Sequence, residues 1–73
     1  MEIHLENTAK IVSLNGVPAR VWEGHTESGI PVHAYITRIA VAKEEDTAQF
    51  ERELSATRAP SAEVEALPLR MIL

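Results

Sequence analysis

Residues 10–23 decide the fold, and they read Lys-Ile-Val-Ser-Leu-Asn-Gly-Val-Pro-Ala-Arg-Val-Trp-Glu. The Asn15-Gly16 dipeptide at their centre is the strongest short signal for a β-hairpin, because both residues tolerate the positive φ of a type I′ turn. The flanking residues include three valines and one isoleucine, and both residue types are enriched in strands. We therefore predict an antiparallel hairpin with strands over residues 10–14 and 17–23.

A two-residue turn also predicts the register of this hairpin. The expected opposite pairs are Leu14 with Val17, Val12 with Ala19, and Lys10 with Val21. Pro18 has no N–H, so we expect that side of the strand to face away from a partner. This register places five aliphatic side chains on one face of the sheet, namely Val12, Leu14, Val17, Ala19 and Val21.

A second turn at Thr26-Glu27-Ser28-Gly29 leads into a third strand over residues 31–41. A two-residue or a four-residue loop would place Val32, Ala34 and Ile36 on the same side as Val21. A three-residue loop with Gly29 in the left-handed region would turn the third strand over. We favour the first arrangement because it produces one consistently aliphatic face.

The pattern changes after residue 43, where we predict a helix over residues 44–57. Three acidic residues gather at its start, where the helix dipole favours negative charge, and Pro60 follows its end. Phe50 and Leu54 are four residues apart and share one side of the helix. We expect them to be its most buried residues, packed on the aliphatic face at Val12, Val21 and Ile36.

The remaining segments are shorter. Ser61 can cap a turn that runs to Ala66, and residues 68–73 are typical of a terminal strand. Residues 1–6 alternate apolar and polar side chains and are a candidate for another strand. The fold class is therefore predicted as α+β, a single small domain over residues 1–73. It comprises a three-stranded antiparallel β-meander, one α-helix packed on one face and a C-terminal β-strand.

Composition excludes several function classes. The chain has 73 residues and no cysteine, so disulfides and thiol chemistry are absent. Its formal net charge is −4, and it has no basic stripe of the kind that binds nucleic acid non-specifically. Its longest apolar run is Ile39–Ala42, far short of the roughly 20 residues of a membrane span. Residues 1–6 lack the apolar segment of a signal peptide. We therefore expect a cytoplasmic protein without a membrane partner.

No chemical motif is evident. Four residues lie near the second turn, namely Glu23, His25, Glu27 and His33. Their spacing matches no metal site, and we interpret them as polar side chains that face solvent at the end of a hairpin. The serines have no nucleophile-elbow setting, and the three separated glycines form no phosphate-binding loop. We expect no catalytic, cofactor-binding or metal-binding residue, and hence no enzyme.

One group of residues predicts an interaction surface. The face opposite the aliphatic one is expected to carry the only Trp and the only Tyr, and such exposed aromatic patches mark interfaces. The apolar C-terminal strand needs a pairing partner, either in its own monomer or in a second copy. The predicted interaction residues are Arg20, Trp22, His33, Tyr35, Leu69, Met71 and Leu73.

The leading functional prediction is a non-enzymatic protein-interaction module that self-associates as a homodimer and binds an unknown protein partner. The alternative is a small single-stranded nucleic-acid-binding protein, because aromatic and basic side chains across a sheet stack and hold single strands. That activity would use Arg20, Trp22, Tyr35 and Arg38. The net acidity of the chain opposes it.

Three runs, over residues 15–24, 26–32 and 37–41, carry a resemblance. They resemble small uncharacterised proteins of bacteriophages and prophages, and the resemblance covers roughly residues 10–73. It implies a bacterial cytoplasmic setting and an accessory role. It supplies no catalytic residue.

Overall fold

The computed structural model describes residues 1–68 and the backbone of Arg70 and Met71. The elements in chain order are β1 (Ile3–Leu14), β2 (Val17–Thr26), β3 (Pro31–Ile36), α1 (Thr47–Ser55), α2 (Ala62–Glu65) and β4 (Arg70–Met71). The first three strands form an antiparallel sheet, and the order across the sheet is β3-β2-β1-β4. The prediction of an α+β protein with a three-stranded antiparallel sheet is confirmed. Within the described residues, no helix has the length and apolar character needed to cross a membrane.

The first hairpin forms as predicted. Asn15 has φ 50° and Gly16 has φ 87°, and Leu14 lies opposite Val17 across this two-residue turn. The first strand is longer than expected, because β1 continues through the N-terminal segment. A β-bulge interrupts its register between residues 7 and 11, so the expected pairing of Lys10 with Val21 is not formed.

The second turn has three residues, which is the arrangement that the sequence analysis did not favour. Gly29 has φ 92°, its N–H donates to Thr26 O over 2.9 Å, and Thr26 N–H donates to Ile30 O over 2.9 Å. Val21 therefore lies opposite Tyr35 rather than opposite Ala34 or Ile36. The predicted orientation of the third strand is wrong, because a one-residue change in register moves every side chain to the other face.

The third strand is also shorter than the predicted 31–41, because β3 ends at Ile36. Its last partner on β2 is Arg20. In an antiparallel ladder every second residue of β2 donates its N–H toward β3, and the next donor after Arg20 would be Pro18. Pro18 has no N–H, so the ladder stops there.

The core lies on one face of the sheet, which we call the α2 face. It consists of Val12, Ala19 and Val21 from the sheet with Val64 from α2, and all four are at most 1% exposed. Ser61 caps α2 as expected, because its side chain accepts a hydrogen bond from the N–H of Val64. A helix of only four residues therefore covers the aliphatic face.

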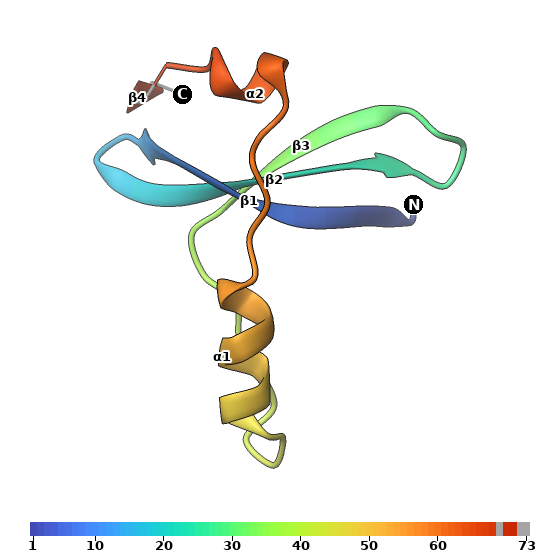
Figure 1. Ribbon diagram of the computed structural model, residues 1–73, viewed down its shortest axis with the longest axis vertical. Helices are drawn as coiled ribbons and strands as arrows, with labels where there is room; N and C mark the ends of the chain where they lie inside the picture. The colour runs from blue at the N-terminus through green and yellow to red at the C-terminus, as the bar shows by residue number, and fades with distance from the viewer. Residues whose placement is uncertain (69, 72–73) are drawn as a thin grey trace.

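The longer helix lies on the opposite side of the sheet, which we call the α1 face (Figure 1). It begins at Thr47, because the Asp46 side chain accepts from Gln49 N–H over 3.0 Å as the N-cap, and it has no buried residue. Phe50 and Leu54 line a hollow with Trp22. They are the least exposed residues of α1, as predicted. The predicted packing on Val12 and Val21 is wrong, because Val64 occupies that face.

The C-terminal prediction lies largely outside the described residues. The backbone of Arg70 and Met71 pairs in parallel with Ser13 and Leu14 of β1. Leu69, Ile72 and Leu73 are not described, so the predicted strand over residues 68–73 is not confirmed.

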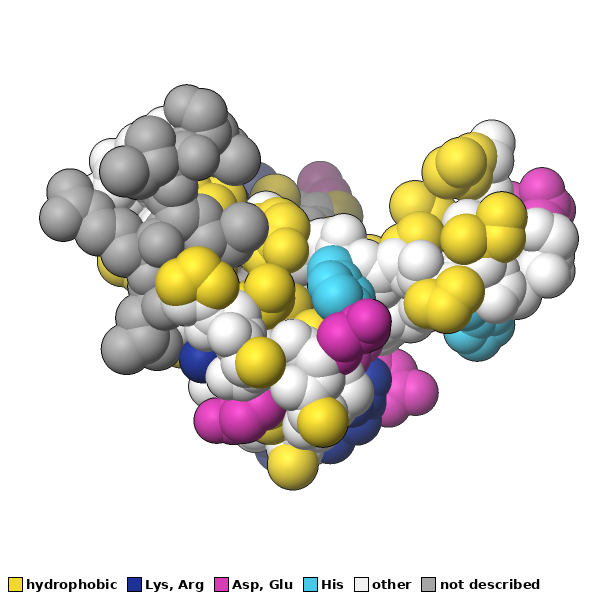
Figure 2. All heavy atoms as spheres, turned by 90° about the horizontal axis from the view of Figure 1, so that it is seen from above, with side chains coloured by type: hydrophobic (Ala, Val, Ile, Leu, Met, Phe, Trp, Pro, Cys, Tyr) yellow, Lys and Arg dark blue, Asp and Glu magenta, His cyan; other side chains and the backbone are white. Residues whose placement is uncertain are grey.

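The chain is extended for its size. Its Cα radius of gyration is 13.3 Å, whereas about 11 Å is expected for a compact domain of this length. Its accessible surface is 5454 Å², about 950 Å² more than the roughly 4,500 Å² expected for a folded monomer of this mass. The surplus surface is consistent with the projecting helix α1 and with the hairpin arm that carries the N-terminus in Figures 1 and 2.

Candidate interaction surface

The structure separates the residues that the sequence placed together. Arg20 and Trp22 lie on the α1 face, where both line hollows beside α1. Tyr35 lies opposite Val21 and His33 opposite Glu23, so both project from the α2 face. The prediction of one shared face is wrong, and the three-residue turn before β3 is the reason. Leu69 and Leu73 lie outside the described residues, and only the backbone of Met71 is described.

A hollow lies on the α1 face, between the sheet and α1. It has a volume of about 520 Å³. Its apolar lining comes from β1, β2, the segment after β3, and α1, namely Leu5, Trp22, Ile39, Phe50 and Leu54. An adjoining hollow of about 250 Å³ shares three of these residues and adds Ile36 from the end of β3. This face therefore combines an aromatic side chain with aliphatic ones and leaves them incompletely covered.

The hollow includes residues that the sequence analysis assigned elsewhere. The spacing of Phe50 and Leu54 correctly indicated an apolar side of the helix, but it did not indicate which face of the sheet that side meets. A contact of Asn7 accompanies this placement, because its side-chain Nδ2 donates to Leu54 O over 2.6 Å and joins the end of α1 to β1. A lone asparagine before a bulge carries no sequence signal for such a contact.

The bulge in β1 is the point where the later segments cross the sheet. Thr8 is fully buried there; its hydroxyl donates to Val21 O over 2.7 Å and accepts from Lys10 N–H over 3.2 Å. The backbone of Arg58 pairs with the same bulge, where Ala9 N–H donates to Arg58 O over 3.0 Å. The guanidinium of Arg20 donates to Thr8 O over 2.7 Å. These contacts give partners to the Thr8 hydroxyl and to Thr8 O, and they hold the strap between α1 and α2, residues 56–61.

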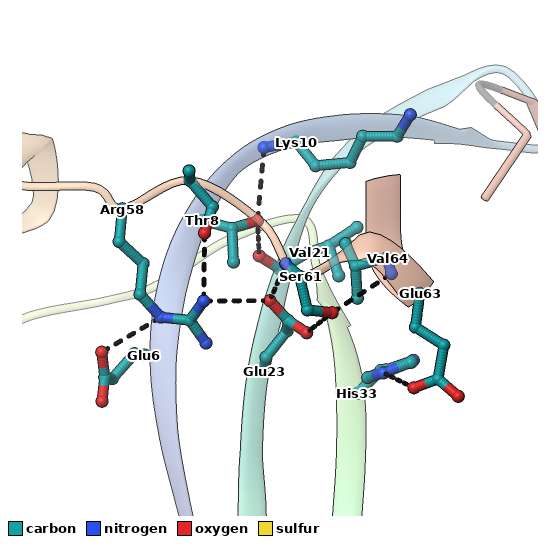
Figure 3. A network of polar contacts seen from close by, with 11 residues as sticks. Glu6, Thr8, Lys10, Val21, Glu23, His33, Arg58, Ser61, Glu63 and Val64 are labelled. Carbon is teal, nitrogen blue, oxygen red and sulfur yellow. Dashed lines mark hydrogen bonds and ion pairs between the residues drawn. The ribbon is translucent and has the colours of Figure 1, made fainter. Parts of the chain in front are cut away.

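A buried carboxylate fixes the far end of that strap (Figure 3). Glu23 is 8% exposed, and it accepts hydrogen bonds from Ser61 N–H over 2.9 Å, from the Ser61 hydroxyl, and from Arg58 Nη1 over 3.1 Å. Arg58 also donates through Nε to Glu6 over 3.1 Å. The carboxylate therefore joins the strap and the start of α2 to β2.

Burial raises the pKa of the Glu23 carboxyl, but the hydrogen bonds from Ser61 and the charge and hydrogen bond of Arg58 lower it by more. The pKa of Glu23 accordingly lies below its ordinary value. A carboxylate engaged on both oxygens is poorly placed to accept a further proton from a substrate. We interpret this group as a structural anchor.

The histidines form no chemical centre in the part of the chain that the structure describes. His4 and His25 stack across β1 and β2 with ring centroids 5.7 Å apart, and His33 Nε2 lies 3.8 Å from a carboxylate oxygen of Glu63. Among the described residues, no group of three or more histidine, aspartate and glutamate side chains could hold a metal ion.

Exposed apolar side chains extend beyond the hollow. Figure 2, which views the molecule from the α2 side, shows hydrophobic side chains on the arm formed by the N-terminus and the β2–β3 turn. Met1 is 99% exposed, Ile3 47% and Ile30 60%. Large apolar side chains at such exposure favour contacts with another protein surface.

Comparisons of the chain with protein-family models, with curated proteins and with solved structures found no match.

Proposed function

We propose that the protein is a non-enzymatic interaction module that associates with a second copy of itself. The observation that carries the proposal is its surplus of about 950 Å² of accessible surface over a compact monomer of the same mass. A standard interface covers about 800 Å² on each partner. The surplus is therefore of the size that one specific contact removes from solvent.

The distribution of apolar groups supports the same proposal. Only four hydrophobic residues of the described chain are buried, and α1 buries none. Trp22, Phe50 and Leu54 remain around an open hollow, and aromatic side chains in such positions are the usual anchors of protein interfaces. Leu69, Met71 and Leu73 remain part of the proposal as an apolar segment that follows the described body of the protein.

The alternative, binding of single-stranded nucleic acid, loses its main support. It required Arg20, Trp22 and Tyr35 on one surface, and the structure divides them between two faces. Arg20 also uses its guanidinium on Thr8 O of its own chain. The proposed setting, a phage or prophage accessory protein in a bacterial cytoplasm, rests on the sequence resemblance alone.

Sedimentation equilibrium tests the proposal. The expected result at micromolar concentration is a mass of twice 8.1 kDa. The dimer should not weaken as the salt concentration rises, because an apolar contact does not depend on counterion release. The same sample mixed with a labelled single-stranded oligonucleotide at low salt should show no binding. A protein that stays monomeric at the highest soluble concentration would overturn the proposal.

A further inference from the structure

The strand β3 is an open edge of the sheet. It has one neighbour, β2, whereas β1 is flanked on its other side by the backbone of Arg58 and by β4. Within the described residues, no hydrogen bond joins the outer side of β3 to another segment. Natural proteins usually blunt such edges with lysines, bulges or covering loops. Here only Pro31, at the first position of the strand, has that effect.

The register shows which backbone groups are free. Thr26 N–H donates to Ile30 O, so this pair is hydrogen-bonded, and the pairing of β2 with β3 continues without a shift. Bonded and non-bonded pairs alternate along an antiparallel ladder. Val32, Ala34 and Ile36 therefore direct their N–H and C=O groups to β2. The same groups of His33 and Tyr35 point outward.

We propose that β3 of one copy pairs antiparallel with β3 of a second copy, with the two-fold axis at Ala34. This inference rests on the proposed self-association and names its surface. In this register His33 of one copy exchanges N–H and C=O hydrogen bonds with Tyr35 of the other. A two-fold contact satisfies the free groups on both edges at once, because each copy presents the same pair.

The side chains of β3 suit pairing with themselves. On the α1 face, Ala34 meets Ala34, and Val32 of one copy meets Ile36 of the other. On the α2 face, His33 meets Tyr35. Cross-strand pairs of aromatic side chains stabilise antiparallel sheets relative to an Ala–Ala pair, so this support comes from the two His33–Tyr35 pairs.

Charge also favours this edge. The chain carries a net charge of −4, so two copies repel each other over most of their surface. Residues 28–43 contain no aspartate or glutamate. Two copies that meet along β3 bring no carboxylates of that segment together. The Glu63 carboxylate of α2 also lies beside β3, and it is 3.8 Å from the Nε2 of His33 in its own copy.

A cysteine introduced at the axis tests the register directly. The chain has no cysteine, so any disulfide must come from the new thiol. In the proposed dimer Ala34 lies opposite Ala34 of the second copy as a non-hydrogen-bonded pair. The Cα atoms of such a pair lie about 4.5 Å apart, and a disulfide spans that separation. Ala34→Cys should form a covalent dimer under mild oxidation at least tenfold faster than Val17→Cys, although Val17 is the more exposed strand position, in the first hairpin.

The neighbouring positions test the pairing in a second way. Val32→Cys and Ile36→Cys should each dimerise slowly alone, and a mixture of the two variants should form the mixed disulfide rapidly. Equal rates for the separate variants and the mixture would contradict the proposed register.

A backbone substitution tests the edge without a thiol. The N–H of His33 points outward and has no partner within the described monomer, so His33→Pro leaves the pairing with β2 intact. It should weaken the dimer at least tenfold in sedimentation, while circular dichroism shows an unchanged fold. His33→Ala, which keeps the N–H, is the control and should retain the dimer.

The outcomes separate this inference from the proposed function. If the wild type is dimeric but Ala34→Cys oxidises no faster than Val17→Cys, the β3 contact is wrong and self-association stands. Dissociation by Trp22→Glu in that case would place the contact at the hollow on the α1 face. If the wild type is monomeric, both proposals fail.

Discussion

Replacement of Val64 by alanine tests whether α2 closes the core. Val64 is the only buried residue of that helix, and its side chain is fully covered by the sheet face that carries Val12, Ala19 and Val21. If this contact holds the four-residue helix in place, the loss of two methyl groups must lower the free energy of unfolding. If α2 is merely adjacent, the change should be small.

The expected magnitude follows from the burial. Transfer of two methyl groups costs about 0.8 kcal/mol each, and the cavity left in a core adds to this. Alanine is the better helix former by about 0.5 kcal/mol, which offsets part of the loss. We expect Val64→Ala to lower the free energy of unfolding by about 2 kcal/mol, a large fraction of the roughly 4–11 kcal/mol expected for a chain of this length.

Urea denaturation followed by the fluorescence of Trp22 measures this change. Trp22 is the only tryptophan and lies on the α1 face, so Val64→Ala does not alter the surroundings of the probe directly. Val17→Ala is the matched control, because the same two methyl groups leave a side chain that is 50% exposed. It should cost less than about 1 kcal/mol, as expected for a strand surface position. Equal costs for the two variants at the same protein concentration would refute the assignment of Val64 to the core.

Four further substitutions test other parts of the structure. Gly24→Ala should prevent folding, seen as loss of the β-sheet signal in circular dichroism, because the new Cβ would lie 1.7 Å from His4 O. Gly16→Val should cost about 1 kcal/mol or more in urea, since a β-branched residue resists the positive φ at that position. Leu54→Ala should cost about 1 kcal/mol in the same assay, less than the 2–5 kcal/mol of a fully buried leucine, because α1 buries no residue. The pKa of Glu23 is lowered in the folded state. Its contribution to the free energy of unfolding is therefore fully present above the ordinary glutamate pKa, and it is lost as the pH falls through the pKa of the folded state. Glu23→Gln should therefore lower stability at pH 7 and flatten the acid limb of a stability–pH profile.

The parts of the fold that depend on local chemistry could be predicted from the sequence. Asn15-Gly16 selects its turn because few other dipeptides accept two positive φ angles, and the structure shows both. Ser61 was recognisable as a cap because its side chain can accept from an N–H three residues later, and it does so from Val64. In both cases residues adjacent in the sequence decide the outcome.

The orientation of β3 depends on a choice that the local sequence leaves open. Thr26-Glu27-Ser28-Gly29 is compatible with loops of two, three or four residues, and the face of every later residue in the strand follows from that count. The aliphatic character of Val32, Ala34 and Ile36 favoured the wrong count. In the structure these side chains lie on the α1 face, and Tyr35 packs against the core instead.

The helix that covers the aliphatic face is also not the predicted one, and this difference has another cause. The pattern of Phe50 and Leu54 made the longer helix the natural cover for the aliphatic face, whereas α2 offers that face only Val64. Long-range polar contacts join each helix to its face of the sheet: Glu23 accepts from Ser61 N–H at the start of α2, and Asn7 donates to Leu54 O at the end of α1. Such contacts join residues more than 35 positions apart and leave no periodic signal in the sequence.

The small core and the open edge of β3 have a common consequence for the proposed self-association. A chain of this length buries a modest share of its surface and usually needs a disulfide, a metal or a partner chain to add stability. It has no cysteine, and its described residues hold no group of three metal-ligating side chains. A second copy paired along β3 would add strands to the sheet beyond β3, which is only six residues long and is the edge strand on that side of β2. Because a partner that binds only the folded state stabilises that state by mass action, association and folding would then be coupled, and the residues that hold β3 in register would determine both.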